Sequence, residues 1–319
     1  MTTRLSKKPG NFVEVKHSTA KMRSQNVIQK KHHSEEQVSM ELAQYVTYLS
    51  AKCIKAKDSF TVVLSGGTLI HTLRKLVEQP NSDCIDWSKW FVFWVDERVV
   101  SLEDPDSNYK LAYDAFLSKV PIPDCNIFAI DDELSPEEAA EEYEARLRLL
   151  VDNKTIGVSS CGGFPKFDLV LLGMGPDGHV ASLFPWLYQR YEEERWVTFV
   201  KDSPKPPSSR ITMTFPVINS SSECALVVTG KQVAQAVKVA LASPAASNFI
   251  PLPVEMVSPQ GNLTWFVDKD ALSQISTIHH HSRNKLSFQL GFVVLIIACV
   301  LYYFPYMLLP LLKQQYRLV

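Results

Sequence analysis

Short apolar segments alternate along the chain with amphipathic segments, and this alternation limits the possible folds more than any other feature. Residues 59–64 are mainly apolar and β-branched or aromatic, which predicts a buried strand. Further strands are predicted at 90–95, 167–172, 225–229 and 265–267. Strands that are apolar along their whole length are typical of parallel sheets. We therefore expect an α/β fold, a mostly parallel sheet with helices on both faces.

The segments between these strands have helical periodicity and recognisable helix starts. Ser34 and Gln37 fit a capping box, and Ser135 precedes a helix with Pro136 at its first position. Helices are expected from residue 34 onward and at 69–77, 108–120, 135–151, 232–241 and, as a last turn, 269–275.

Polar clusters follow three of the predicted strands. They are Ser65-Gly66-Gly67-Thr68, Asp96-Glu97-Arg98 and the loop from Gly173 to His179. The carboxyl ends of parallel strands lie at one edge of a sheet, and ligands bind there. We therefore expect the three clusters to form a single site.

The cluster at residues 65–68 has two interpretations. Two glycines let the backbone approach a ligand, and the N–H groups at the start of the next helix attract anions, which favours a phosphate site. The alternative is a tight turn in which Ser65 or Thr68 caps the helix.

The loop from Gly173 to Gly178 matches G-x-G-x-x-G, but a dinucleotide site is poorly supported. The ribose-binding acid of that motif would fall in the charged segment 192–195 instead of at the end of a strand. The distinctive residue is His179, expected at a helix start. A helix N-terminus disfavours the imidazolium form and leaves a neutral base for water. The alternative is a histidine that only caps the turn.

Three charged residues after an apolar strand favour a cleft, because charges are costly to bury without partners. Arg98 is a candidate for binding phosphate or a developing oxyanion, and Asp96 for orienting Arg98 or positioning water. A solvated charged turn is the alternative.

The charge distribution argues against nucleic acid as a partner. Residues 1–33 carry eight Lys or Arg and one Glu, whereas residues 34–278 carry 21 basic and 33 acidic side chains. An acidic body is a poor phosphate-backbone binder. The six cysteines form no C-x-x-C pair, which excludes a zinc ribbon and favours a reducing compartment. We expect no metal.

Five blocks of residues, in order, resemble the 6-phosphogluconolactonase family, and the plant enzymes most of all. They are Leu64-Ser65-Gly66-Gly67-Thr68; Asp96-Glu97-Arg98-Val99-Val100 followed by Ser107-Asn108-Tyr109; Gly173 to Pro185; Arg210 to Asn219; and Val227-Val228-Thr229-Gly230. The resemblance implies the sugar-phosphate isomerase-like fold and hydrolysis of 6-phospho-D-glucono-1,5-lactone, the second step of the oxidative pentose phosphate pathway, without metal or organic cofactor.

The resemblance also implies roles for individual residues. His179 matches the general base, Arg98 an arginine beside the lactone, and Asp177 and Asp96 complete the catalytic candidates. The phosphate candidates are Ser65, Gly66, Gly67, Thr68, Arg210 and Lys231. Lys231 is the nearest cation to Val233, where the family has a lysine, and Trp186 replaces a common glycine.

Two other functions stay open. A glucosamine-6-phosphate deaminase shares this fold, but its family has an Asn-Glu-Pro segment where this chain has Leu183-Phe184-Pro185, without the carboxylate that ring opening needs. A non-catalytic sugar-phosphate-binding paralogue is the second alternative, although His179 and Arg98 are retained.

We expect three regions in the chain: a basic leader at 1–24, a catalytic domain at 25–278 and a tail at 279–319. The leader has the composition either of a transit peptide or of a solvated extension. Residues 290–312 are 23 residues without a charge, long enough to cross a bilayer. The interpretations of that segment are a membrane anchor and a tail with no evolved role. The sequence favours a cytoplasmic enzyme, with or without the anchor, over a plastid enzyme.

Overall fold

A computed structural model of the chain describes residues 27–241 and 250–275. The predicted leader at 1–24 and the tail at 279–319, with its apolar segment 290–312, lie outside these residues. No helix within the described ranges is long and apolar enough to cross a bilayer. The membrane anchor therefore stays a prediction from sequence.

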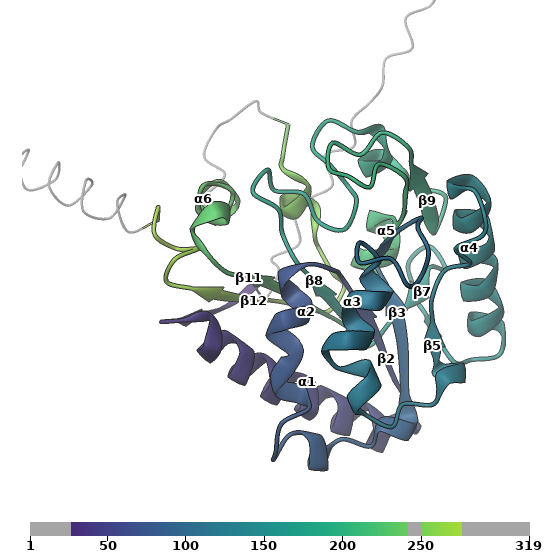
Figure 1. Cartoon of the computed structure of the whole chain (residues 1–319), viewed down its shortest axis with the longest axis horizontal. Helices are drawn as coiled ribbons and strands as arrows, with labels where there is room; N and C mark the ends of the chain where they lie inside the picture. Colours follow the sequence, from purple (N-terminus) through teal and green to yellow (C-terminus); the bar gives the residue numbers. More distant parts are fainter. Residues whose placement is uncertain (1–26, 242–249, 276–319) are drawn as a thin grey trace, which may run out of the picture.

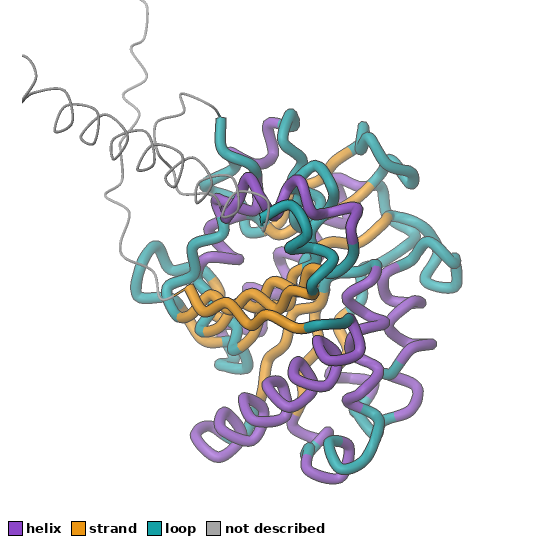
Figure 2. Tube along the Cα trace, turned by 90° about the vertical axis from the view of Figure 1, so that its left-hand side faces the viewer, coloured by secondary structure: helices purple, strands orange, loops and turns teal. Residues whose placement is uncertain are grey.

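A seven-stranded parallel sheet forms the centre of the molecule, as expected (Figure 1). Figure 2 shows its strands side by side with helices around them. In order across the sheet, the strands are β1 (Val27–His32), β12 (Asn262–Asp268), β11 (Glu223–Val228), β8 (Leu169–Leu172), β2 (Phe60–Leu64), β3 (Trp90–Trp94) and β5 (Ile127–Phe128).

Two smaller antiparallel sheets accompany the main one. The first contains β4 (Asp96–Arg98), β10 (Arg210–Met213) and β9 (Val197–Val200), and the second pairs β6 (Gly157–Val158) with β7 (Pro165–Lys166).

Helices cover both faces of the main sheet because successive side chains of its strands point to opposite sides. Val62 belongs to the core cluster beneath α1, α2 and α3, whereas Val63 belongs to the cluster beneath α4, α5 and α6. The helices are α1 (Glu35–Lys57), α2 (Thr68–Thr72), α3 (Asn108–Ala115), α4 (Pro136–Asp152), α5 (Phe215–Asn219) and α6 (Ala234–Leu241).

The helix starts follow the predicted caps, with one difference. Ser135 and Glu138 form a reciprocal capping box before α4. Ser34 accepts a hydrogen bond from the Gln37 N–H, but the Gln37 side chain accepts from the His33 N–H instead of from Ser34. The box at residue 34 is therefore only half formed.

Two helix predictions are too long, and a third is wrong. The segment 69–77 is α2 followed by a 3₁₀ helix (Leu73–Leu76), and the segment 108–120 leaves α-helical geometry after Ala115. The last predicted turn, 269–275, forms turns without a helix. Helical spacing of apolar residues also fits consecutive turns that pack one face on the sheet, so spacing alone overestimates helix length.

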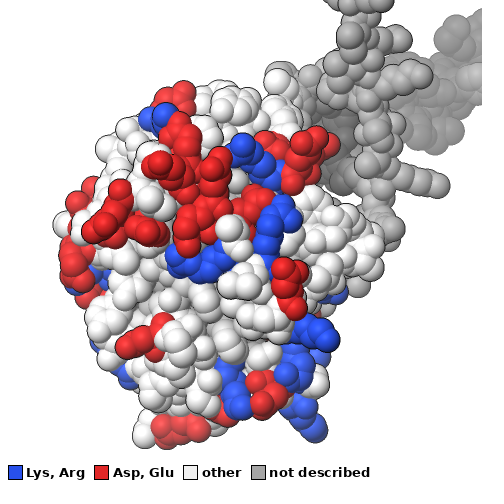
Figure 3. Space-filling view, turned by 90° about the vertical axis from the view of Figure 1, so that its right-hand side faces the viewer, with Lys and Arg blue, Asp and Glu red and all other residues white. Residues whose placement is uncertain are grey.

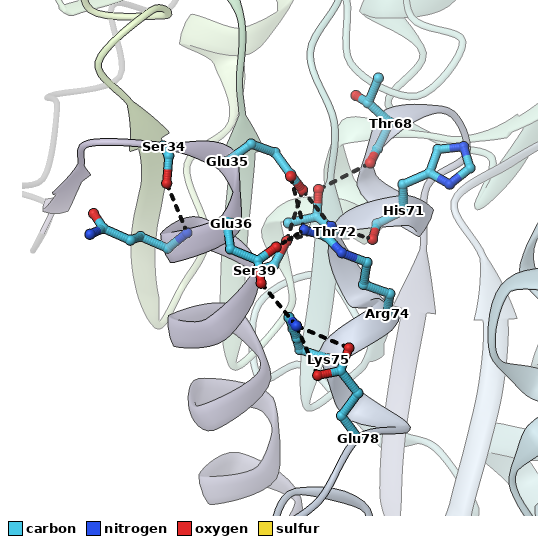
Figure 4. A network of polar contacts seen from close by, with 11 residues as sticks. Ser34, Glu35, Glu36, Ser39, Thr68, His71, Thr72, Arg74, Lys75 and Glu78 are labelled. Carbon is cyan, nitrogen blue, oxygen red and sulfur yellow. Dashed lines mark hydrogen bonds and ion pairs between the residues drawn. The ribbon is translucent and has the colours of Figure 1, made fainter.

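Polar contacts fix α2 and the 3₁₀ helix that follows it against α1 (Figure 4). The Arg74 guanidinium donates to Glu35 at 2.7 and 3.0 Å and to the Ser39 hydroxyl at 2.8 Å, and it also contacts Glu36. Because both side chains are partly exposed, the Arg74–Glu35 ion pair contributes at most about 1 kcal/mol. These contacts hold the 3₁₀ helix against α1 and so help to fix the position of α2, which begins directly after Gly67.

One face of the molecule displays the acidic side chains expected from the composition of residues 34–278 (Figure 3). Figure 3 shows Asp and Glu side chains gathered over the upper part of the face that carries α4 and β9.

Candidate active site

A cavity of about 300 Å³ lies at the carboxyl edge of the main sheet, where the polar clusters were expected to meet. Loops after β2, β3, β8 and β11 contribute to it, together with the segment before β10. The predicted site residues in its wall are Ser65, Gly66, Gly67, Thr68, Asp96, Arg98, His179 and Arg210. Lys231 does not line the cavity, whereas Lys205 and Gln232, which the sequence did not single out, do.

The loop at residues 65–68 leads into α2 without a side-chain cap. Gly67 is the N-cap of α2 with φ of 68°, a conformation that favours glycine, and no side chain caps the helix. The alternative in which Ser65 or Thr68 caps the helix is therefore wrong. The backbone N–H groups at the start of α2 remain available to a ligand, and they favour an anion.

His179 lies in a loop and not at a helix start, so that prediction is wrong. Residues after it form turns and a short bridge between Val180 and Leu183, with Ala181 at a φ of 50° that a helix does not allow. The group that contacts the His179 ring is a carboxylate and not a helix N-terminus. Its Nδ1 lies 2.5 Å from Asp177 Oδ1, and its ring lies 4.5 Å from that of Phe184.

The Asp177–His179 contact fixes the tautomer of the imidazole. A carboxylate oxygen accepts, so Nδ1 carries the hydrogen and Nε2 is left to take a proton. Partial burial raises the pKa of Asp177, but the hydrogen bond and the charge interaction with His179 together lower it by more, so the net pKa is below the ordinary value. Asp177 therefore stays charged beside the ring.

Glycines in the loop 173–178 serve the histidine and the turn. A Cβ at Gly175 would lie 2.0 Å from His179 Cε1, and Gly178 has φ of 80°. These needs explain the second and third glycines of the G-x-G-x-x-G match without a dinucleotide.

The segment 96–98 is not a solvated turn. It forms β4, in register with β10 so that Arg98 pairs with Arg210, and Asp96 and Glu97 are 5% and 1% exposed. Asp96 forms no ion pair with Arg98 among the described residues; its Oδ2 accepts from the Ser182 hydroxyl at 2.8 Å. Arg98 donates through Nη1 to the Asp106 carbonyl at 2.6 Å, and its buried Nε has no hydrogen-bond partner in the part of the chain that the structure describes. The idea that Asp96 orients Arg98 is therefore wrong.

Glu97 holds the start of α3 against β4. Its Oε1 accepts from the N–H groups of Arg98 and Asn108, and its Oε2 accepts from the N–H of Tyr109, each at 2.7 Å. Burial raises the pKa of Glu97 to about 7, and these N–H donors oppose the rise because they stabilise the carboxylate.

We expect Glu97→Gln to lower the free energy of unfolding by about 1–3 kcal/mol, because the amide NH₂ would face backbone N–H donors. Urea unfolding at pH 8 checks this. Glu133→Gln, the same change on an exposed side chain, is expected to shift it by less than about 0.5 kcal/mol. Equal stabilities of the two variants would contradict the role of Glu97.

Arg210 is 3% exposed and has a structural part as well as a place in the wall. Its Nε donates to the Pro207 carbonyl at 3.0 Å and its Nη2 to the Lys205 carbonyl at 2.8 Å. Burial lowers the pKa of Arg210, and the nearby Asp96 charge opposes that shift. Arg210 therefore holds the segment that brings Lys205 to the cavity.

Sequence reasoning missed several residues of the site. Asn108 follows the N-cap Ser107, and Ser182 lies three residues after His179. Both positions stand inside motifs, but nothing in the sequence shows that their side chains meet Asp96. Among the described residues, no group of three or more His, Cys, Asp or Glu is placed to hold a metal.

The sequence of this chain is similar to those of known sugar-phosphate enzymes. A family model described as glucosamine-6-phosphate isomerases/6-phosphogluconolactonase matches residues 33–265. A probable chloroplastic 6-phosphogluconolactonase 4 of Oryza sativa subsp. indica is 56% identical over 243 residues, which are 76% of this chain and 75% of that protein. The chloroplastic 6-phosphogluconolactonase 3 of Arabidopsis thaliana is 55% identical over 241 residues, 76% of this chain and 73% of that protein.

The fold of this chain is also similar to that of a solved structure. The crystal structure of 6-phosphogluconolactonase from Thermotoga maritima is 30% identical, with a TM-score of 0.64, and covers 76% of this chain and 100% of that one.

Proposed function

Because the chain belongs to the family of glucosamine-6-phosphate isomerases and 6-phosphogluconolactonases, we propose that it hydrolyses 6-phospho-D-glucono-1,5-lactone to 6-phospho-D-gluconate. It is an enzyme of the pentose phosphate pathway, and residues 25–278 are the proposed catalytic domain. The observation that carries the proposal is a cavity lined by His179, Arg98 and the loop 65–68, in which Asp177 holds His179 from outside the cavity wall.

His179 activates the attacking water. With Nδ1 bound to Asp177, Nε2 accepts a proton from water as the oxygen attacks the lactone carbonyl carbon. The charge of Asp177 stabilises the imidazolium that forms, so the proton transfer does not leave an isolated cation in the cavity.

Arg98 stabilises the negative charge that develops on the carbonyl oxygen. Its Nε has no hydrogen-bond partner among the described residues, and Arg98 lines the cavity, so we assign this N–H as the donor to that oxygen. When the tetrahedral intermediate collapses, the bond from the carbonyl carbon to the ring oxygen breaks. The imidazolium returns its proton to the ring oxygen, which becomes a hydroxyl, and the product acid ionises. Water and lactone alone balance the reaction.

The phosphate binds at the loop 65–68, where the first N–H groups of α2 have no side-chain cap. Arg210 and Lys205 contribute positive charge from the segment before β10. Lys231, outside the cavity wall, is not proposed as a phosphate ligand.

Within the family, the surroundings of His179 favour hydrolysis over deamination. A deaminase needs a carboxylate for ring opening in the segment that is Leu183-Phe184-Pro185 here. The Phe184 ring packs on the imidazole at 4.5 Å and offers no proton-transfer group.

A coupled assay on the full chain tests the proposal. Freshly made lactone is supplied, 6-phosphogluconate dehydrogenase reports the product, and spontaneous hydrolysis is subtracted. Ammonia release from glucosamine 6-phosphate is measured in parallel. Ammonia release without lactone turnover would assign the chain to the deaminase branch, and neither activity would favour a non-catalytic paralogue.

The names of the relatives bear on location. The rice and Arabidopsis relatives with 55–56% identity are named chloroplastic, against the sequence-based preference for the cytoplasm. We propose a plastid location, consistent with the basic, acid-poor residues 1–26. A fluorescent fusion at the C-terminus of the full chain is expected to enter plastids in leaf cells, and the same fusion starting at residue 27 is expected to stay in the cytosol. Cytosolic fluorescence from both would contradict the proposal.

A further inference from the structure

Two residues of the cavity wall, Asp96 and Asn108, each have a buried acceptor atom with no hydrogen-bond partner within the described part of the chain. Asp96 Oδ2 accepts from Ser182, but Asp96 Oδ1 accepts from nothing. Asn108, 1% exposed, donates through Nδ2 to the Asp96 carbonyl at 2.9 Å, and its Oδ1 is likewise unpaired. Buried polar atoms in folded proteins are nearly always paired, with protein or with ordered water, and these two belong to residues that line the cavity, where a bound ligand can be the partner.

The orientation of the Asn108 amide is fixed by its surroundings. The Asp96 carbonyl can only accept, so the amide nitrogen must face it and the oxygen must face away. Gly66 makes room for this arrangement, since a Cβ there would lie 1.9 Å from Asn108 Oδ1. The first glycine of the loop 65–68 therefore admits the Asn108 side chain.

The chemistry of the two atoms selects one part of the substrate. Neither a phosphate dianion nor a lactone carbonyl can donate a hydrogen bond, whereas each ring hydroxyl can. We propose that Asp96 and Asn108 form a hydroxyl-recognition subsite, in which Asp96 Oδ1 and Asn108 Oδ1 accept hydrogen bonds from ring hydroxyl groups of the sugar. The subsite rests on the proposed function for the identity of the sugar phosphate.

Ser182 is the positioning residue of this subsite. It is fully buried and outside the cavity wall, its hydroxyl donates to Asp96 Oδ2, and its N–H donates to Thr212 Oγ1 at 3.3 Å. One carboxylate oxygen is thereby occupied, which leaves the other for the ligand. Arg210 Nη1 donates to the same hydroxyl at 3.4 Å, so the hydroxyl hydrogen is directed to Asp96.

Binding of a stable ring analogue tests the subsite independently of turnover. The probe is 1,5-anhydroglucitol 6-phosphate, which has the three ring hydroxyls and no lactone carbonyl. Its dissociation constant on the full chain is compared by calorimetry with those of analogues lacking the hydroxyl at C2, C3 or C4. At least one analogue is expected to bind the wild type about tenfold or more weakly, because the acceptor is left unpaired.

Variants of the subsite residues show which residue binds which hydroxyl group. In Asp96→Ala and in Asn108→Ala, the ratio of the dissociation constants of the analogue and the parent probe is expected to fall below about threefold at one hydroxyl. In Ser182→Ala, the ratio is expected to fall at the hydroxyl that hydrogen-bonds to Asp96. A purely structural role of Ser182 would weaken all probes equally. Asp106→Ala, which removes an exposed carboxylate close by, is expected to keep the wild-type ratios. If Asp96→Ala does not fold, Asn108→Ala and Ser182→Ala carry the test.

The outcomes separate the subsite from the reaction. Equal binding of all four probes by the wild type, no binding of the parent probe, or unchanged ratios in the variants would overturn the subsite. Lactone turnover is measured on the same samples. Discrimination between the probes without lactone turnover would support the subsite and refute the proposed reaction. Lactone turnover without discrimination between the probes would support the reaction and refute the subsite.

Discussion

Replacement of His179 by alanine is expected to lower kcat for the lactone by about 100-fold or more, which is the usual range for loss of a general base. The imidazole is the group in the cavity with a nitrogen left to accept a proton, because Asp177 occupies the other nitrogen. The coupled assay measures kcat after the spontaneous rate has been subtracted. Substrate affinity is expected to change little, since the phosphate binds elsewhere.

Two further variants make this result specific. His71→Ala removes an exposed histidine outside the cavity wall and is expected to keep wild-type kcat. Asp177→Asn keeps the shape of the pair but removes its charge, so its kcat is expected to lie between those of the wild type and His179→Ala. Near-normal turnover of a folded His179→Ala variant would remove His179 from the role of base.

The main sheet could be predicted from sequence wherever burial leaves a continuous apolar run. Strands β2, β3, β8 and β11 have such runs, and the elements between them have helical periodicity. β1 was missed because it is an edge strand with two lysines and pairs only with β12. Edge strands carry charge to avoid pairing with other chains, so their pattern resembles that of a loop.

The small sheet of β4, β10 and β9 could not be predicted because β4 forms a strand only by pairing with a distant segment, and its local sequence does not favour a strand. Asp96-Glu97-Arg98 has the composition of a turn, and its strand geometry depends on β10, more than 100 residues later in the chain. Burial of Glu97 carries a desolvation cost, which three backbone N–H groups from two segments offset in part. No local pattern shows that these donors converge.

The site could be predicted to the level of its loops but not of its contacts. Motif residues after three strands met as expected in one cavity. The expected helix start at His179 failed because Gly178 and Ala181 have positive φ values, which break helical geometry on both sides of Val180. The Asp96–Ser182 and Asn108–Asp96 contacts join segments 86 and 12 residues apart, and only the folded chain shows them.

A methyl group at position 175 is expected to cost about 100-fold in kcat, although residue 175 takes no part in the chemistry. The Cβ of Gly175→Ala would lie 2.0 Å from His179 Cε1, 2.2 Å from its Nδ1 and 2.7 Å from Asp177 Oδ1, so the pair must move. The backbone has little freedom to absorb the clash, since the Gly175 N–H donates to the His179 carbonyl at 2.9 Å. A shift of about 1 Å in a reacting group can cost about 100-fold.

Gly175 does not have a positive φ, so the variant tests the space beside the imidazole and not the backbone conformation. Gly173→Ala is the matched control in the same loop, because its Cβ would meet no heavy atom closer than 3.9 Å. Its loss of kcat is expected to stay below about tenfold. Both variants are measured in the coupled assay, with thermal melting to show that they fold. If Gly175→Ala turned over lactone as fast as Gly173→Ala, the imidazole would not work from the position that Asp177 and Gly175 define, and the catalytic assignment of the pair would have to be abandoned.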